Sequence, residues 1–214
     1  MHPRYIAIEG PIGVGKTVLA ERLAPRFDAR LLLEPTDNPF LGQFYGDRRG
    51  SAFSTQMWFL VTRHQQLRDV AQGKLFQQVV VADYLFEKDR IFAYLNLNDT
   101  ELATYEKLYQ FLEADVPHPD LVVYLQAKVE TLIRRIRRRG RATERRISEE
   151  YLEQVVQAHD HFFFRYEGAP LLVVDTNDIN PVEKDSDLED LAGRIRAMER
   201  GGVEYYRPKG LTGE

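Results

Sequence analysis

A glycine-rich stretch close to the start of the sequence has the residue types and spacing of a phosphate-binding loop. Residues 10–17 consist of a glycine, four further residues and then Gly-Lys-Thr, and they lie between an apolar run at 5–8 and helically spaced apolar positions in 18–23. Glycines let the backbone curl until successive N–H groups face phosphate oxygens, and a helix N-terminus adds positive potential. Lys16 would reach the β- and γ-phosphates, and the Thr17 hydroxyl would hold magnesium. The motif predicts contacts to ATP from Gly10, Pro11, Ile12, Gly13, Val14, Gly15, Lys16 and Thr17.

Acidic residues follow two of the short apolar runs that are typical of buried parallel strands. Glu34 comes after the run 29–33 and Asp83 after the run 78–82. Because ligands bind beyond the carboxyl ends of parallel strands, both side chains would lie at the same crevice as the loop. Glu34 could accept the proton of a hydroxyl that attacks the γ-phosphate, and Asp83 could lie near magnesium. On position alone, a glutamate at a strand end is more often simply solvated.

Other polar residues could complete a two-substrate site. Gln56 and Arg63 lie seven residues apart, two turns along nearly one face of a predicted helix, so an amide and a guanidinium could both address one flat polar ligand. The alternative is that both are solvated helix residues. Asp175 and Asn177 follow a run at 171–174 and would lie at the crevice edge, on the ATP side.

An arginine-rich segment stands out in an otherwise acidic chain. Eight arginines occur within residues 134–146, a local concentration that favours anion binding. Gly140 lies inside the run, a phosphate-binding loop lies elsewhere, and aromatic residues do not alternate with the arginines. These features favour a mobile lid at about 134–147 that closes over ATP phosphates, and a solvated or polyanion-binding face is the alternative.

The elements that must position these residues form an α/β pattern. Apolar runs at 5–8, 29–33, 78–82, 121–125 and 171–174 predict a five-stranded parallel sheet flanked by helices. Predicted helices include a long amphipathic one from Phe53 to Gly73, one from Asp99 to Asp115 and a last one from Asp185 to Arg200. We expect a single domain over residues 1–200 and a C-terminal tail over 201–214.

Composition narrows the classes of function. The 214 residues include 29 basic and 33 acidic side chains, a net charge of −4 that gives no general case for a nucleic-acid polymer as partner. The absence of cysteine excludes disulfides, thiolate catalysis and Cys-ligated zinc. No apolar run approaches membrane-spanning length, and no signal peptide is expected before the first strand. We therefore expect a cytoplasmic protein without a membrane partner.

The ordered set of motifs resembles the deoxynucleoside kinase family, which includes deoxycytidine, deoxyguanosine and deoxyadenosine kinases. The likeness extends up to about residue 180. It rests on the phosphate-binding loop, on Glu34-Pro35, on Tyr45 eleven residues before Gln56, on Arg63 seven residues after Gln56, and on Arg139-Gly140-Arg141 followed by Glu144.

The resemblance implies a P-loop kinase that transfers the γ-phosphate of ATP, with Mg²⁺, to the 5′-hydroxyl of a deoxynucleoside. Deoxyguanosine or deoxyadenosine is the expected substrate, and deoxycytidine is the alternative. In that reading Glu34 is the base, Tyr45 and Glu144 bind the 3′-hydroxyl, and an acid at Asp89 joins Gln56 and Arg63 at the base. If the spacing slips by one residue, Lys88 takes the place of Asp89. The resemblance also implies a homodimer through the helix from Asp99 to Asp115. Lid arginines that would clamp the transferred phosphate are Arg135, Arg139 and Arg141.

The chain departs from the family pattern at one position. The family usually has an acidic residue, arginine and serine after its third strand, where this chain has Asp83-Tyr84-Leu85. Bacterial members similar to deoxyguanosine and deoxyadenosine kinases tend to carry such a variant, so we interpret the tyrosine as a subgroup mark.

Two other functions fit some of the motifs. A nucleoside monophosphate kinase of the thymidylate type also has a P-loop and an arginine lid, but it needs a cationic acceptor site where this chain has Glu34-Pro35. A catalytically idle family member kept as a binding subunit is the second, although Lys16, Thr17 and Glu34 are all present.

Overall fold

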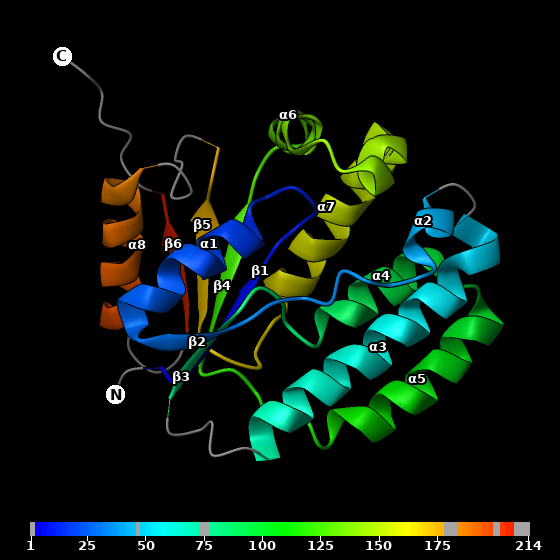
Figure 1. Ribbon diagram of the computed structural model, residues 1–214, viewed down its shortest axis with the longest axis horizontal. Helices are drawn as coiled ribbons and strands as arrows, with labels where there is room; N and C mark the ends of the chain where they lie inside the picture. Colours follow the sequence, from blue (N-terminus) through cyan, green and yellow to red (C-terminus); the bar gives the residue numbers. More distant parts are fainter. Residues whose placement is uncertain (1–2, 46–47, 73–77, 178–183, 199–201, 208–214) are drawn as a thin grey trace.

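The centre of the fold is a six-stranded sheet in which all paired strands run parallel (Figure 1). The computed structural model describes residues 3–45, 48–72, 78–177, 184–198 and 202–207. The strand order is β2-β3-β1-β4-β5-β6. Strands β2 and β3 therefore lie on one side of β1, and strands β4, β5 and β6 lie on the other side. The strands are β1 (Tyr5–Glu9), β2 (Ala29–Leu32), β3 (Val79–Ala82), β4 (Leu121–Gln126), β5 (Leu171–Asp175) and β6 (Val203–Tyr206).

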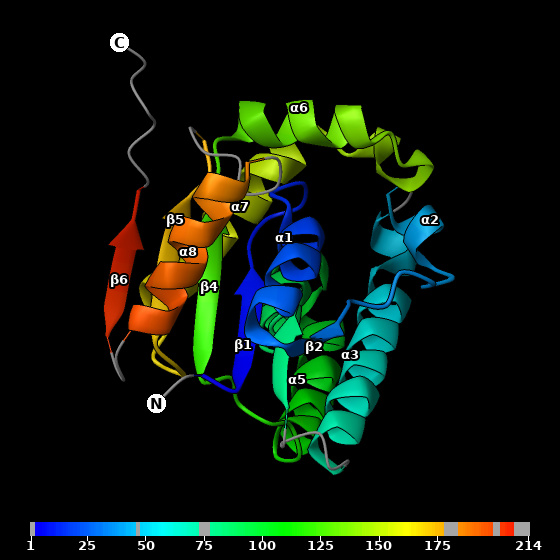
Figure 2. The same ribbon diagram turned by 60° about the vertical axis from the view of Figure 1, so that its left-hand side comes forward.

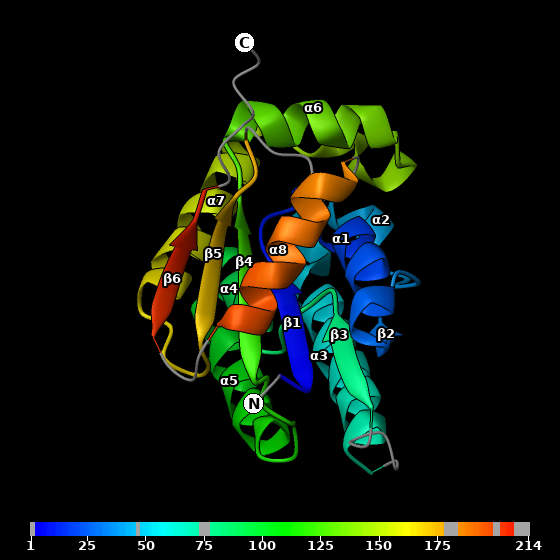
Figure 3. The ribbon, with the colours of Figure 1, turned by 90° about the vertical axis from the view of Figure 1, so that its left-hand side faces the viewer.

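Helices cover both faces of the sheet, as Figures 2 and 3 show. Helices α1 and α8 cover one face, and α3, α4, α5 and α7 lie on the other, while α6 crosses above the carboxyl ends of the strands. The helical segments are α1 (Lys16–Leu23), η1 (Ala24–Phe27), α2 (Leu41–Phe44), α3 (Arg48–Gln72), α4 (Lys88–Asn96), α5 (Asp99–Glu113), α6 (Val129–Arg139), η3 (Ala142–Arg146), α7 (Glu149–Phe164) and α8 (Asp185–Ala197).

Two hydrophobic cores follow from the two-residue period of the buried strands. In β1, Ile6 and Ile8 pack on the side of α1 and α8, whereas Tyr5 and Ala7 pack on the side of α3 and α5. All four side chains are at most 5% exposed, as expected for a central strand that is covered on both faces. Within the described residues, no helix has both the length and the apolar character needed to cross a membrane.

The predicted α/β fold with a helix-flanked parallel sheet is confirmed, but the expected number of five strands is wrong. The sixth strand, β6, lies in the segment predicted to be a C-terminal tail. Val203 and Tyr205 are 50% and 75% exposed, so this edge strand has no apolar run that sequence reasoning could detect. The last predicted helix ends at Ala197, and its expected end at Arg200 lies outside the described residues.

Candidate active site

A cavity of about 400 Å³ opens at the carboxyl edge of the sheet, beside the P-loop. It lies where the strand order reverses around β1, which is the usual ligand position in an open parallel sheet. Segments far apart in the sequence line it: the P-loop, the end of β2, α2, α3, α4 and the lid. The predicted site residues among its lining are Ile12, Gly13, Gly15, Lys16, Thr17, Glu34, Tyr45, Gln56, Arg63, Arg139, Arg141 and Glu144.

The P-loop has a backbone that only glycine accommodates. Gly13 has φ +86°, and a Cβ there would lie 2.6 Å from Cγ1 of Ile136 on α6. Gly15, at φ 108°, is the N-cap of α1. Lys16 Nζ donates to the carbonyl of Gly10 at 2.6 Å and lies 3.8 Å from Glu9 Oε1. The loop thus provides a close backbone turn and a lysine next to it, as phosphate binding requires.

Asp83 joins the P-loop to the end of β2. Its Oδ2 accepts a hydrogen bond from Thr17 Oγ1 at 2.6 Å, and its Oδ1 accepts one from the backbone N–H of Glu34 at 2.5 Å. Burial raises the pKa of Asp83, while the Thr17 hydrogen bond opposes that rise. A carboxylate beside a threonine hydroxyl is the oxygen donor set that Mg²⁺ prefers, so these two residues fit the ion.

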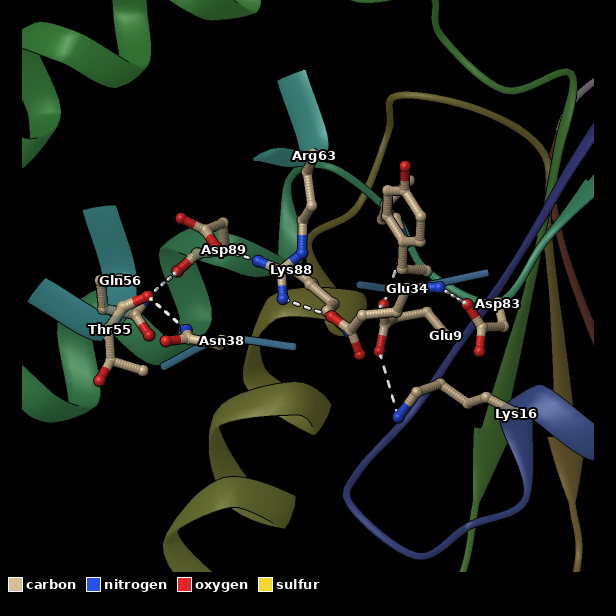
Figure 4. A network of polar contacts seen from close by, with 12 residues as sticks. Glu9, Lys16, Glu34, Asn38, Thr55, Gln56, Arg63, Asp83, Lys88 and Asp89 are labelled. Atoms are coloured by element: carbon tan, nitrogen blue, oxygen red, sulfur yellow. Dashed lines mark hydrogen bonds and ion pairs between the residues drawn. The ribbon is translucent and has the colours of Figure 1, made fainter. Parts of the chain in front are cut away.

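Two cations contact the Glu34 carboxylate (Figure 4). Both Arg63 Nη2 and Lys88 Nζ contact the same oxygen, Oε1, the lysine at 2.8 Å. Burial alone would raise the pKa of this carboxyl group, but Lys88, Arg63 and Lys16 outweigh burial and hold the pKa well below its usual range. Glu34 is therefore a carboxylate, and both cations contact its Oε1 rather than its Oε2.

Arg63 connects Glu34 to a buried polar group around Asp89. Arg63 Nη1 contacts Asp89 Oδ1, and the Tyr105 hydroxyl donates to Asp89 Oδ2 at 2.9 Å. Gln56 Nε2 donates to the backbone carbonyl of Asp89 at 3.1 Å. Burial raises the pKa of Asp89 to about 6, which leaves the carboxyl group ionised at neutral pH. Gln56 and Arg63, predicted from their spacing, and Asp89, implied by the family resemblance, thus form one contact network (Figure 4).

The lid brings Glu144 and two arginines to the cavity near Tyr45. Arg139 pairs with Glu144 through two hydrogen bonds of 3.1 and 2.6 Å, and Arg141 Nη1 lies 3.8 Å from Glu144 Oε1. Burial, together with the nearby Tyr151 and Glu144, raises the pKa of Tyr45 well above its usual range, so its hydroxyl stays neutral. Binding of phosphate by Arg139 would compete with this ion pair.

Three further predicted site residues lie around α6, namely Arg135, Asp175 and Asn177. None of the three is among the residues that line the cavity. Arg135 donates to the carbonyl of Val14 at 3.0 Å and to the carbonyl of Thr176 at 2.7 Å, so it connects α6 to the P-loop and to the end of β5. Asn177 accepts from the backbone N–H of Lys128 at 2.8 Å and donates to Asp175 at 2.7 Å. Contacts of these three residues with ATP stay predictions.

Sequence reasoning missed two contributors to the site. Glu9 is fully buried at the end of β1, and Lys88, considered only as a possible replacement for Asp89 at the base, instead contacts Glu34. A charged residue that ends an otherwise apolar strand was the available signal for Glu9. Tyr84, which stands where the family usually has arginine, is fully buried and donates to Gln66 Oε1 at 2.9 Å.

Comparison with known proteins identifies the family to which the chain is related. The deoxynucleoside kinase family model matches residues 6–198. A deoxyguanosine kinase of Bacillus subtilis is 36% identical over 200 residues, which cover 91% of this chain and 97% of the relative. A deoxyadenosine/deoxycytidine kinase of the same organism is 27% identical over 203 residues, covering 90% of this chain and 92% of the relative.

Solved structures show the same relationship. A deoxyadenosine kinase from M. mycoides with dCMP and dCDP bound matches with a TM-score of 0.79 at 27% identity, covering 91% of this chain and 100% of that chain. The dATP-bound form matches with a TM-score of 0.77 at 26% identity, covering 90% of this chain and 98% of that chain. With the P-loop, the Glu34 carboxylate and the lid around one cavity, and with the family model matching over 6–198, this chain belongs to the deoxynucleoside kinase family.

Proposed function

We propose that this protein transfers the γ-phosphoryl group of ATP to the 5′-hydroxyl of a purine deoxynucleoside. The observation that carries the proposal is the position of Glu34, a carboxylate that lines the same cavity as Lys16, Thr17 and the base-side residues. A base there is within reach of an acceptor hydroxyl and of the phosphate site together, as in-line transfer requires.

Each part of the cavity has a task in this reaction. Glu34 takes the proton of the 5′-hydroxyl as the oxygen attacks the γ-phosphorus and the bond to the β-phosphate oxygen breaks. Lys16 and the lid residues Arg139 and Arg141 stabilise the charge on the phosphate oxygens. Mg²⁺, held by Thr17 and Asp83, supplies further charge neutralisation when it is bound.

The opposite end of the cavity selects the nucleoside. Tyr45 and Glu144 would bind the 3′-hydroxyl, which disfavours analogues that lack it because buried partners are then left unpaired. Gln56, held against the Asp89 carbonyl, offers an amide to the edge of the base. The 36% identity to a deoxyguanosine kinase and the likeness to deoxyadenosine kinases support a purine, with deoxyguanosine or deoxyadenosine as the preferred substrate.

We also infer that the protein acts as a homodimer through α5. Phe111 on α5 is 76% exposed, and Tyr94 on the neighbouring α4 is 56% exposed, so large apolar side chains face outward there. The cytoplasmic location and the absence of nucleic-acid and membrane partners stay predictions from the sequence.

The direct test is transfer of labelled γ-phosphate from ATP to each of the four deoxynucleosides and, in parallel, to each deoxynucleoside monophosphate. We expect labelled monophosphates from deoxyguanosine or deoxyadenosine. Transfer only to monophosphates would instead indicate a thymidylate-type kinase. Calorimetric binding of deoxynucleosides without any transfer would indicate an idle binding subunit. If the folded protein shows neither phosphate transfer nor deoxynucleoside binding, the proposal is rejected.

A further inference from the structure

A lysine is buried at the start of α4, next to the proposed base. Lys88 is 3% exposed and lies between carboxylates from two different strands. Its Nζ is 2.8 Å from Glu34 Oε1 and 3.7 Å from Glu9 Oε2. Lysine is almost never fully buried unless it is paired, because removing its charge from water is costly. Lys88 thus occupies a position in which its charge is compensated on two sides.

Glu9 is the fixed partner of the two. It is fully buried, its Oε1 accepts a hydrogen bond from the Gly10 N–H at 2.8 Å, and its Oε2 accepts one from the Leu85 N–H at 3.0 Å. Burial would raise the pKa of Glu9, but Lys88 and Lys16 outweigh it and lower the pKa to about 2. This carboxylate is ionised and held by backbone groups of both the P-loop and the segment before α4, so it sets the position of the Lys88 ammonium group.

Glu34 is the more exposed partner, with a side chain that is 25% exposed. Arg63 from α3 and Lys88 from α4 both contact Oε1, so the two contacts together restrict rotation of the carboxylate. Arg63 also contacts Asp89, so its guanidinium group is shared between two carboxylates. We propose that Lys88, held by Glu9, is a positioning residue that fixes Glu34 through Oε1 and so presents Oε2 to the acceptor hydroxyl. This inference rests on the proposed kinase function.

The charged groups around Glu34 and Lys88 come from several elements of the fold. Among the described residues, the groups that influence the Glu34 carboxylate include Lys88 from α4, Arg63 from α3 and Lys16 from α1. Asp83 at the end of β3 acts on it with the opposite sign. Around Lys88, Glu9 is the second carboxylate, and the ring of His159 from α7 lies 3.8 Å from Glu9 Oε1. Without Lys88, Glu34 Oε1 loses one of its two cation contacts and keeps the one with Arg63, so the carboxylate is less firmly held toward the acceptor hydroxyl.

The test compares kcat and KM for the deoxynucleoside in wild type, Lys88→Met and Lys88→Arg. Lys107→Met, an exposed lysine on α5, is the matched control. We expect Lys88→Met to lower kcat by about 10- to 100-fold, since misplaced catalytic groups cost rate on this order. KM for the deoxynucleoside should stay within about threefold. Lys88→Arg, which keeps the positive charge, should recover most of the activity.

Several outcomes would overturn the inference. These are an unchanged kcat in Lys88→Met, an effect on KM for the deoxynucleoside in place of kcat, or a loss of kcat that Lys88→Arg does not rescue. If Lys88→Met is unfolded by circular dichroism, Lys88→Gln, which keeps a hydrogen-bond donor without the charge, is evaluated by the same criteria. Wild-type protein that phosphorylates no deoxynucleoside would reject the kinase proposal itself, whereas active wild type with an unaffected Lys88 variant would reject only the role of Lys88.

Discussion

The substitution Glu34→Gln isolates the proton-accepting step. The amide has the shape of the carboxylate, so its oxygen can stay against Arg63 and Lys88 at the Oε1 position. The NH₂ group then occupies the Oε2 position, which places a donor where the 5′-hydroxyl needs an acceptor. The change therefore removes the base while it leaves the volume of the cavity nearly unaltered.

The expected loss of rate follows from the role of a general base. Such a group contributes about 10²- to 10⁴-fold, which corresponds to a barrier increase of about 3–5 kcal/mol. In the proposed function, deoxynucleoside binding depends mainly on Tyr45, Gln56 and Glu144, which the substitution does not change. We therefore expect kcat to fall by about 10²-fold or more, with KM within about threefold.

The cost to folding should be smaller. Arg63 keeps its contact with Asp89, and Lys88 keeps Glu9 at 3.7 Å, so neither cation is left without a carboxylate. Losing one charge-assisted contact on a side chain that is 25% exposed should cost about 1–2 kcal/mol, well below the stability of a typical domain. The variant should therefore be folded under assay conditions.

The assay is initial-rate phosphate transfer from labelled ATP, combined with calorimetric titration of deoxyguanosine. Glu21→Gln on the exposed side of α1 is the matched control and should behave as wild type. Retention of more than about a tenth of the wild-type kcat would refute the assignment of Glu34 as the base. Loss of nucleoside binding in parallel with kcat would show that Glu34 acts in binding instead.

Three further predictions concern Glu9, Tyr45 and Phe111. Folding stability should fall as the pH drops from about 4.5 towards 2, because unfolded Glu9 takes up a proton there whereas the folded carboxylate, with its pKa lowered to about 2, does not. The stability that Glu9 contributes and loses is about 3 kcal/mol, so the stability measured by urea unfolding should fall more steeply with pH in wild type than in Glu9→Gln; equal slopes would contradict it. Tyr45→Phe should raise KM for a deoxynucleoside by about 10-fold but leave KM for the 2′,3′-dideoxy analogue unchanged, and an equal effect on both would argue against the 3′-hydroxyl contact. Phe111→Glu on α5 should shift the sedimentation coefficient from dimer to monomer, unlike Phe164→Glu on α7, which alters a side chain that is 82% exposed elsewhere; an unchanged coefficient would place any dimer interface away from Phe111.

Much of the fold could be predicted because its signals are local. The buried strands β1 to β5 are apolar runs, and the start of α5 has a capping box in which Asn98 accepts from the Glu101 N–H and Glu101 accepts from the Asn98 N–H. The edge strand β6 could not be found in this way, because its pairing with β5 uses backbone groups that every residue has.

The sequence alone determined the phosphate-binding loop, since the glycines, Lys16 and Thr17 are contiguous and the adjoining strand and helix are encoded next to them. It also singled out Glu34, Tyr45, Gln56, Arg63 and Glu144 as candidates, and the structure places all five around one cavity. Only the tertiary structure decided that Lys88 reaches Glu34 and Glu9, because these residues come from α4, the end of β2 and β1. Their contact depends on the strand order β2-β3-β1, which places distant chain segments side by side, and no spacing within one element reveals it.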